Sequence, residues 1–340
     1  MNGSAFGTAI DSSATHQIRT LPILVLFPHN RCNCRCVMCD IWKIRQVREI
    51  RIEDLRPHVD SLLALGIRWI VLSGGEPQLH SEFKALSQLI RDHGIRVSLL
   101  TAGLLLESEA DSVAEVVDDV IVSLDGPPSV HDRVRRVPQA FARLARGVEG
   151  LRKLRPQMAI RGRSTVQKDN CIYLRQTVQA AKQIGLDSIS FLAADVTSGA
   201  FNRPHGWTPD RQNTVALDGN EVRALEAEVE ALILEFGTDV ASGFIVESAE
   251  KLRRIVLHFR AHLGELAPVA PKCNAPWVSA VIEADGAVRP CFFHPPLGNI
   301  RDKPILDIIN GPEAIHFRQQ LDIPTNAICQ RCVCSLHLLT

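Results

Sequence analysis

Short apolar segments alternate with amphipathic segments between residues 21 and 195. The apolar runs, such as "LPILVLF" from residue 21 and "DVIVSLDG" from residue 119, have the length of buried strands. The stretches between them, such as "IEDLRPHVDSLLALG" from residue 52, place apolar residues at helical spacing and often end at glycine. Strands joined by crossover helices predict an α/β fold with a parallel sheet. We expect a partial (β/α)6 barrel, with its chemistry at the C-terminal ends of the strands.

The pattern changes after residue 195. Residues 196–217 are rich in Pro, Gly and Asn, which predicts a long loop, and helical patterns follow at 220–236 and 247–264. The segment "WVSAVIEADGAVRPCFF" predicts a hairpin that turns at Asp285 and Gly286. We therefore divide the chain into a flexible N-terminal segment (1–20), a barrel (21–217), a helical bridge (218–269) and a small C-terminal domain of a hairpin and helices (270–340).

Composition narrows the class of protein. The 340 residues carry 38 basic and 38 acidic side chains, a formal net charge of zero. This balance argues against nucleic-acid or anionic-membrane binding, which needs clustered Lys and Arg. The chain has no apolar run long enough to span a membrane and no secretory signal, so we expect a cytoplasmic protein. Ten cysteines in that reducing compartment indicate metal or redox ligands rather than disulfides.

Three cysteines follow the first predicted strand at C-x3-C-x2-C spacing, namely Cys32, Cys36 and Cys39. A cubane iron–sulfur cluster takes one thiolate per iron, so a loop that offers three leaves one iron open to another ligand. Open coordination positions distinguish catalytic metal sites from structural ones. A zinc knuckle and an inert loop are the alternatives that the spacing alone leaves open.

This loop resembles the cluster-binding signature of the radical S-adenosylmethionine (SAM) superfamily. Met38 departs from the signature, because the residue before the third cysteine is usually aromatic. The resemblance implies that Cys32, Cys36 and Cys39 hold a 4Fe-4S cluster whose fourth iron binds the amino and carboxylate groups of SAM. Reductive cleavage of SAM would then give a 5′-deoxyadenosyl radical that abstracts hydrogen from a substrate. It also implies a flavodoxin- or ferredoxin-type reductant as partner.

Further residues at the ends of predicted strands match the SAM-binding positions of this family. The "SGGEP" segment resembles its GGE motif, which binds the SAM amino group; "SLDG" suits the ribose hydroxyls, and "IRGRSTV" the SAM carboxylate. The implied SAM-binding residues are Gly74, Gly75, Glu76, Ser123, Asp125, Arg163 and Ser164. Singly, each segment is also compatible with an ordinary turn, a helix-capping Asp or a solvated Arg. For His29, just before the cysteine loop, we expect a hydrogen-bonded structural role.

A second group of cysteines lies in the C-terminal segment. Cys273, Gly286 and Cys291 resemble the C-x(9–15)-G-x4-C element that opens the SPASM and twitch extensions of radical SAM enzymes. The resemblance implies one auxiliary 4Fe-4S cluster, ligated by Cys273, Cys291, Cys329 and Cys332. Five cysteines are too few for two cubanes, and a structural zinc is the alternative. We expect Cys34, Cys171 and Cys334 not to be ligands.

Together these features predict a radical SAM enzyme that oxidises, dehydrogenates or rearranges a small polar metabolite. Residues 196–217 and the segment before Cys273 are expected to shape its pocket. A peptide-modifying maturase acting on a ribosomal precursor is one alternative. A radical epimerase is another, for which Cys171, Cys334 or Cys34 would be the hydrogen donor. An iron–sulfur electron carrier is the non-enzymatic alternative, against which the GGE motif argues, because a carrier needs no SAM site. The residues indicate no particular oligomeric state.

Overall fold

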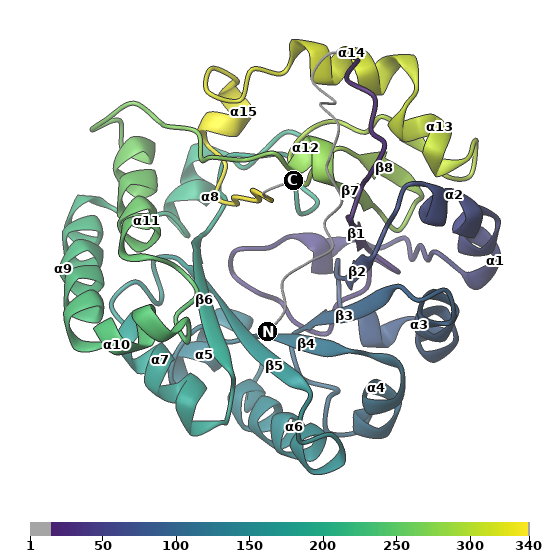
Figure 1. Cartoon of the computed structure of the whole chain (residues 1–340). Coiled ribbons are helices and arrows are strands. Elements are labelled where there is room, and N and C mark those ends of the chain that lie inside the picture. Colours follow the sequence, from purple (N-terminus) through teal and green to yellow (C-terminus); the bar gives the residue numbers. More distant parts are fainter. Residues whose placement is uncertain (1–14, 339–340) are drawn as a thin grey trace.

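The computed structural model describes residues 15–338, and its centre is one nine-stranded sheet of order β6-β5-β4-β3-β2-β1-β7-β8-β9 (Figure 1). The first six strands are all parallel, which confirms the predicted α/β fold and parallel sheet. Their bounds are β1 Ile23–Leu26, β2 Trp69–Leu72, β3 Arg96–Thr101, β4 Asp119–Ser123, β5 Ala159–Val166 and β6 Ser188–Ala193. The sheet curves, and helices surround it (Figure 1).

Crossover helices connect these strands. Most have an apolar stripe that packs on the sheet, as their sequence pattern predicts. They are α1 Ile52–Leu55, α2 Val59–Ala64, α3 Phe83–Asp92, α4 Ala110–Val116, α5 Pro128–Arg135, α6 Ala140–Leu154 and α7 Leu174–Gln183. Short 3-10 turns lie at η1 Ile41–Lys43, η2 Arg56–His58 and η3 Pro77–Leu79.

The two faces of the sheet differ because successive side chains of a strand point to opposite sides. On the outer face, Leu24 and Val120 are fully buried and belong to the main hydrophobic core together with Leu144 of α6. Each such leucine stabilises the fold by roughly 1.5–3 kcal/mol relative to exposure. On the inner face, their neighbours Val25 and Ile121 line a cavity. The inner face is therefore the surface available to a ligand.

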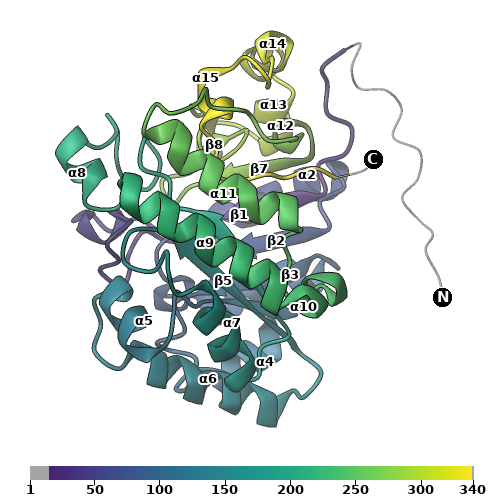
Figure 2. The same cartoon turned by 90° about the vertical axis from the view of Figure 1, so that its left-hand side faces the viewer.

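The region after β6 contains the predicted loop and helical patterns. Residues 196–217 are mostly irregular, with one short helix, α8 Pro209–Asn213. Three further helices follow: α9 Gly219–Glu235, α10 Gly237–Ser242 and α11 Ala249–His262. The capping box between Asp218 and Glu221 and the Ser248 cap explain where α9 and α11 begin. Helices α9 and α11 pack side by side on the outside of the molecule (Figure 2).

The C-terminal segment extends the barrel sheet. Strand β7 Ser279–Ile282 pairs in parallel with β1, and β8 Ala287–Arg289 pairs antiparallel with β7. The hairpin turn lies at Asp285 and Gly286, as predicted, and Gly286 has a φ of +88°. Strand β9 Gly298–Asn299 and four helices complete it: α12 Ala275–Val278, α13 Ile305–Ile309, α14 Pro312–Gln320 and α15 Ala327–Gln330. Figure 2 shows these elements at one end of the molecule.

The N-terminal segment is described in part, and its described end is tied to the C-terminal elements. Residues 1–14, most of the segment predicted to be flexible, lie outside the described residues. Of the rest, Ile18 N donates to Asn310 Oδ1 at 2.8 Å, and Arg318 Nε donates to His16 O at 2.7 Å. The four-part division of the chain stays a prediction. None of the described helices is long and apolar enough to cross a bilayer.

Candidate functional site

The cysteine loop lies between β1 and η1, and the end of α5 holds it. Arg35 N donates to Arg135 O at 3.2 Å, and Val37 N donates to Val134 O at 3.1 Å. Within the loop, Cys39 N donates to Cys36 O at 3.3 Å. The loop therefore follows the C-terminal end of β1, where the sequence places it, and takes its shape from a helix about 100 residues later.

Arg135 contacts a thiol of the cysteine loop directly. Its buried guanidinium lies 2.5 Å from Asp125 Oδ2 and donates to Cys36 Sγ at 3.5 Å. The pKa of Cys36 is lowered to about 6, chiefly by a hydrogen bond from the Cys34 thiol and further by the Arg135 charge. Arg135 thus favours a thiolate at Cys36, the form that ligates iron. It belongs to the "HDRVR" segment after β4, where nothing in the sequence pattern marks its contact with a cysteine.

The loop of residues 196–217 closes over the cysteine loop from the other side. Arg203 Nη2 donates to Met38 O at 2.8 Å, and Asn202 Nδ2 donates to Asp40 O at 2.9 Å. Trp207 Nε1 donates to Asp40 Oδ2 at 2.7 Å. The sequence predicts a long loop here, but its contacts with the cysteine loop come only from the fold.

Arg203 is a second buried guanidinium near a thiol. It donates to Asp195 Oδ2 at 3.2 Å and lies 3.8 Å from the centre of the Trp207 ring. Burial raises the pKa of Cys39 to about 12, and the Arg203 charge opposes that rise. Cationic groups therefore lie beside two of the three cysteines, which suits a cluster held by several thiolates.

The two glycines after β2 allow the chain to approach the cysteine loop. Gly74 has a φ of +101°, and a Cβ atom there would lie 2.8 Å from Phe27 Cβ. A Cβ atom on Gly75 would lie 1.9 Å from Arg31 O, well inside contact distance. Glu76 N donates to Arg31 O at 2.7 Å, and the His29 ring donates through Nε2 to Glu76 O. His29 thus has the hydrogen-bonded structural role that we expected.

Glu76 is fully buried, and its carboxylate is held by three donors. Ala102 N donates to Oε2 at 2.8 Å, and Thr101 Oγ1 donates to Oε1 at 2.8 Å. Gln78 N adds a longer bond to Oε1 at 3.4 Å. Burial raises the pKa of Glu76 to about 7, and these bonds oppose the rise. The carboxylate is therefore oriented and would gain from a cationic ligand.

The remaining predicted SAM contacts do not share one surface. Ser123 and Arg163 are direct partners across β4 and β5, so their side chains point to the same side of the sheet, and Arg163 lines the inner cavity. Ser164 is buried on the opposite face of β5. The carboxylate of Asp125 already accepts from Thr165 N at 2.9 Å and pairs with Arg135. Ser164 therefore faces away from any ligand that Arg163 contacts.

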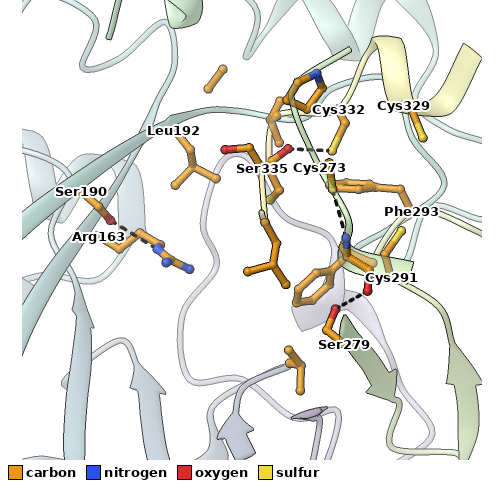
Figure 3. Close-up of a pocket in the computed structure, with 18 of the residues that line it drawn as sticks. Arg163, Ser190, Leu192, Cys273, Ser279, Cys291, Phe293, Cys329, Cys332 and Ser335 are labelled. Carbon is orange, nitrogen blue, oxygen red and sulfur yellow. Dashed lines mark hydrogen bonds between the residues drawn. The ribbon is translucent and has the colours of Figure 1, made fainter. Parts of the chain in front are cut away.

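The C-terminal cysteines meet the barrel across a cavity of about 420 Å³. Figure 3 shows Arg163 and Ser190 on the barrel side and the cysteines on the other. The wall on that side includes all five C-terminal cysteines, namely Cys273, Cys291, Cys329, Cys332 and Cys334. Phe292 and Phe293 fill the space beside them. The hairpin and α15 thus bring together cysteines that are separated by up to 61 positions in the sequence.

Burial dominates the environment of these thiols. It raises the pKa of Cys291, and it raises the pKa values of Cys329 and Cys334 to about 11. The His294 ring lies 3.4 Å from Cys329 Sγ through Nε2, and Cys332 Sγ donates to Cys334 O at 3.1 Å. Thiols of this kind lose their protons when they bind a metal centre.

The donor set fits iron–sulfur clusters at both places. Among residues 15–338, no three Cys, His, Asp or Glu side chains form a preformed site for a single metal ion. The fit therefore depends on the thiols present and on what surrounds them. The first loop has the three predicted ligands with two nearby guanidinium groups, and the second group has five cysteines on one cavity wall, four of which are the predicted ligands. Soft thiolates at such density are the ligands of iron–sulfur clusters and of zinc.

Family models match the two cysteine-bearing parts of the chain. Residues 26–162 match the model described as the radical SAM superfamily. Residues 273–333 match the model of an iron–sulfur cluster-binding domain, SPASM. The matched segments contain the three cysteines of the first loop and the four predicted auxiliary ligands, respectively.

Curated relatives and a solved structure agree with these matches. The chain is 31% identical to an Fe-coproporphyrin III synthase of Methanosarcina barkeri over 84% of this chain and 73% of the relative. It is 28% identical to an AdoMet-dependent heme synthase of the same organism over 86% and 82%. Streptococcus suis SuiB bound to S-adenosylmethionine has a similar fold, with a TM-score of 0.65 at 14% identity over 96% of this chain and 75% of SuiB.

Proposed function

Because this chain belongs to the radical SAM superfamily and has a SPASM domain, we propose that it oxidises a small molecule bound between two iron–sulfur clusters. It is an enzyme that uses a 4Fe-4S cluster, SAM and auxiliary iron–sulfur chemistry. When bound together, the cluster and SAM supply a one-electron cleavage that removes a hydrogen atom from a substrate. The protein's own residues bind SAM, exclude water and present one C–H bond.

The residues that would hold each cofactor lie in three parts of the chain. Cys32, Cys36 and Cys39 would hold the SAM-binding cluster, and Arg135 and Arg203 would offset its charge. The loop of Gly74, Gly75 and Glu76 would hold the SAM amino group, because Glu76 is a buried, oriented carboxylate. We assign one auxiliary cluster to Cys273, Cys291, Cys329 and Cys332.

Contacts to the rest of SAM would come from Ser123, at the end of β4, and from Arg163, its partner on the longer strand β5. Asp125 would contribute through Arg135, which it holds in place, rather than by touching the ribose. Ser164 has no place in this assignment, because it faces the helices.

The cavity between the barrel and the C-terminal cysteines is the observation that supports oxidation. Its volume of about 420 Å³ lies within the range of small-molecule sites, roughly 300–1,000 Å³. A substrate held there would lie against the auxiliary ligands on one side and the barrel strands on the other (Figure 3). Loss of a hydrogen atom would leave a substrate radical with one unpaired electron. A cluster held by Cys273, Cys291, Cys329 and Cys332 would supply the acceptor for that electron while the substrate releases a proton. The net change is a two-electron oxidation.

The names of two curated relatives that cover most of this chain support a small-molecule substrate. The two curated relatives described above are named for porphyrin products, which are compact and carry carboxylates. A peptide substrate is the competing possibility, and it predicts activity only when a precursor peptide is supplied.

The test of this function is anaerobic. The reconstituted protein is mixed with dithionite and SAM, and 5′-deoxyadenosine is measured; no product would refute the radical SAM reaction. Replacing Cys32, Cys36 and Cys39 with Ala should abolish the product. Replacing Cys273 and Cys291 with Ala should lower the iron content by about four atoms per chain while some SAM cleavage remains. A loss of eight would indicate a second auxiliary cluster.

Epimerisation is a second candidate, supported by the position of Cys334. This thiol lines the cavity close to Arg163, where it could return a hydrogen atom to the substrate. Cys171 lies elsewhere, with its thiol 3.6 Å from Lys168 O. An epimerase would incorporate solvent deuterium into its product and would lose turnover, but not SAM cleavage, in the Cys334→Ala variant. An oxidase should show neither effect.

A further inference from the structure

A second cavity, of about 650 Å³, lies on the outer side of the central one. Helix α11 forms one wall, and the irregular segment of residues 266–272 forms another. Lys251, Arg254 and His258 of α11 line both cavities. This outer groove is therefore separated from the central cavity only by one face of a helix.

The charged side chains of the groove are nearly all cationic. Lys251, Arg254, Lys272 and Arg331 line it, with Glu250 as the one acidic residue. His258 and His262 add two imidazoles, whose pKa values burial lowers, so both are neutral near pH 7. The groove has a formal charge of +3, whereas the whole chain has a formal charge of zero.

Cationic side chains on the other face of α11 form ion pairs. Arg253 pairs with Glu230 of α9 at 2.6 Å, and Arg260 pairs with Glu226 at 2.6 Å. No comparable ion pair to a described residue is formed by Lys251 or by any other cation of the groove. On the inner side, Glu247 accepts from Phe191 N at 2.8 Å, and the Lys251 charge acts on this carboxylate without a direct ion pair. Unpaired cations thus gather at one concave surface.

The cations of the groove differ in their hydrogen bonds: Arg254 forms one with the protein, and the ammonium groups of Lys251 and Lys272 form none with a described residue. Arg254 Nη2 donates to Cys332 O at 2.8 Å, which places its charge beside the auxiliary thiols. Lys251 and Lys272 are exposed, with no hydrogen bond from either ammonium to a described residue. Lys251, Lys272 and the exposed Arg331 are therefore the cations available to a ligand, while Arg254 fixes the wall between the two cavities.

The rim of the groove is apolar. Leu257 is 50% exposed and Val269 is 74% exposed, far more than is usual for such side chains, and Pro268 and Ala270 lie beside them. A ligand that matches this surface has an apolar body with anionic groups attached. A phosphate or other small inorganic anion would leave the rim exposed.

We propose that this groove binds a compact molecule with an apolar body and two or more carboxylates, held by Lys251 and Lys272. That this molecule is the substrate, received here before it reaches the central cavity, rests on the function proposed above. Carboxylates of the substrate then contact the ammonium groups, and Arg254 and His258 lie between the arriving molecule and the auxiliary cysteines.

The test uses coproporphyrin III, a fluorescent tetracarboxylate, and the reconstituted full chain. Quenching of its fluorescence gives Kd for the wild type and for the double variant Lys251→Gln, Lys272→Gln. Loss of two charge contacts should raise Kd about tenfold, and raising the salt concentration should weaken wild-type binding more than variant binding. The matched control is Arg253→Gln, Arg260→Gln on the opposite face of α11, which should leave Kd within about twofold of wild type.

Three results would overturn the proposal that the groove binds a polycarboxylate. These are no binding by the wild type, equal weakening in both double variants, or equal binding of the coproporphyrin tetramethyl ester, which lacks the carboxylates. SAM cleavage is measured on the same samples. If wild-type protein binds the porphyrin at Lys251 and Lys272 but never yields 5′-deoxyadenosine, the proposed function fails and the groove stands. If SAM is cleaved but the double variant Lys251→Gln, Lys272→Gln binds the porphyrin as tightly as wild type, the groove proposal fails and the proposed function stands.

Discussion

A methyl group added at Gly75 should separate the SAM-binding loop from the cysteine loop. The Cβ atom of Gly75→Ala would lie 1.9 Å from Arg31 O and 2.6 Å from Arg31 C. Both are backbone atoms, so the clash cannot be relieved by rotating a side chain. The two segments must move apart, and the bond from Glu76 N to Arg31 O, now 2.7 Å, is lost with that movement.

The expected cost follows from these two effects. Forced overpacking costs about 1–3 kcal/mol, and the lost hydrogen bond about 1 kcal/mol more. Gly75→Ala should therefore lower the free energy of unfolding by about 2–4 kcal/mol. Because Glu76 moves with Gly75, SAM cleavage should fall more than tenfold in protein that remains folded.

Urea unfolding of the cluster-free protein, followed by far-ultraviolet circular dichroism, measures the first effect, and 5′-deoxyadenosine formation measures the second. The control is Gly237→Ala at the start of α10, where a Cβ atom meets nothing within 4 Å. That variant should lie within about 1 kcal/mol of wild type. The reasoning is refuted if Gly75→Ala has an unfolding free energy within about 0.5 kcal/mol of the control.

Three further predictions concern the surroundings of the cysteine loop. Arg135→Met leaves Asp125 charged and buried without its partner, so unfolding free energy in urea should fall by about 3–5 kcal/mol. Burial raises the pKa of Glu76 to about 7 from 4.5, so its contribution to stability is complete below about pH 4.5 and is lost as the pH rises toward 7. The SAM-free wild type should therefore lose stability relative to Glu76→Gln between pH 5 and 7 in urea titrations. Trp207→Phe removes the bond to Asp40, and its cluster absorbance should decay several-fold faster with a chelator present.

Each of these predictions has a comparison that can contradict it. Arg133→Met, on the same helix α5, breaks an exposed ion pair with the Asp169 carboxylate and an exposed hydrogen bond to Asp169 O, and it should cost less than about 1 kcal/mol. An equal cost for Arg135→Met would reject the role of the buried pair. If the free energies of unfolding of wild type and Glu76→Gln change in parallel with pH, the raised pKa of Glu76 is rejected. Trp69→Phe removes an indole bond to Ser98 at the start of β2, the end of the sheet opposite to the cysteine loop, so it should leave cluster decay unchanged. Equal decay in both tryptophan variants would show that the bond from Trp207 to Asp40 does not protect the cluster.

The strands were predictable because each is a short apolar run with one face against helices. The hairpin was predictable for a similar local reason, since Asp285 and Gly286 favour a tight turn. The pairing of β7 with β1 was not, because it joins residues about 250 positions apart and no local pattern records it. Strand alternation could have separated Arg163 from Ser164, since neighbours in a strand face opposite sides.

The cysteines were recognisable from spacing alone, whereas their charged neighbours were not. Arg135 and Arg203 come from a helix and a loop that reach the cysteines only in the folded chain. Each arginine is one of many in the sequence, and the two share their burial with Arg318; contact with the cysteine loop is what distinguishes them. Contacts of this kind depend on the packing of distant elements and leave no periodic signal.

The parallel pairing of β1 with β7 sets an order of events during synthesis. Strand β1 is made among the first 26 residues, yet one of its two neighbours ends at Ile282. Until that residue has left the ribosome, β1 presents an unpaired strand edge, which in nascent chains invites aggregation or binding by chaperones. The strand that covers this edge of β1 is therefore made before the cysteines at 329, 332 and 334, which complete the wall of the central cavity last. Iron delivered before that point would meet the first cysteine loop in an unfinished protein.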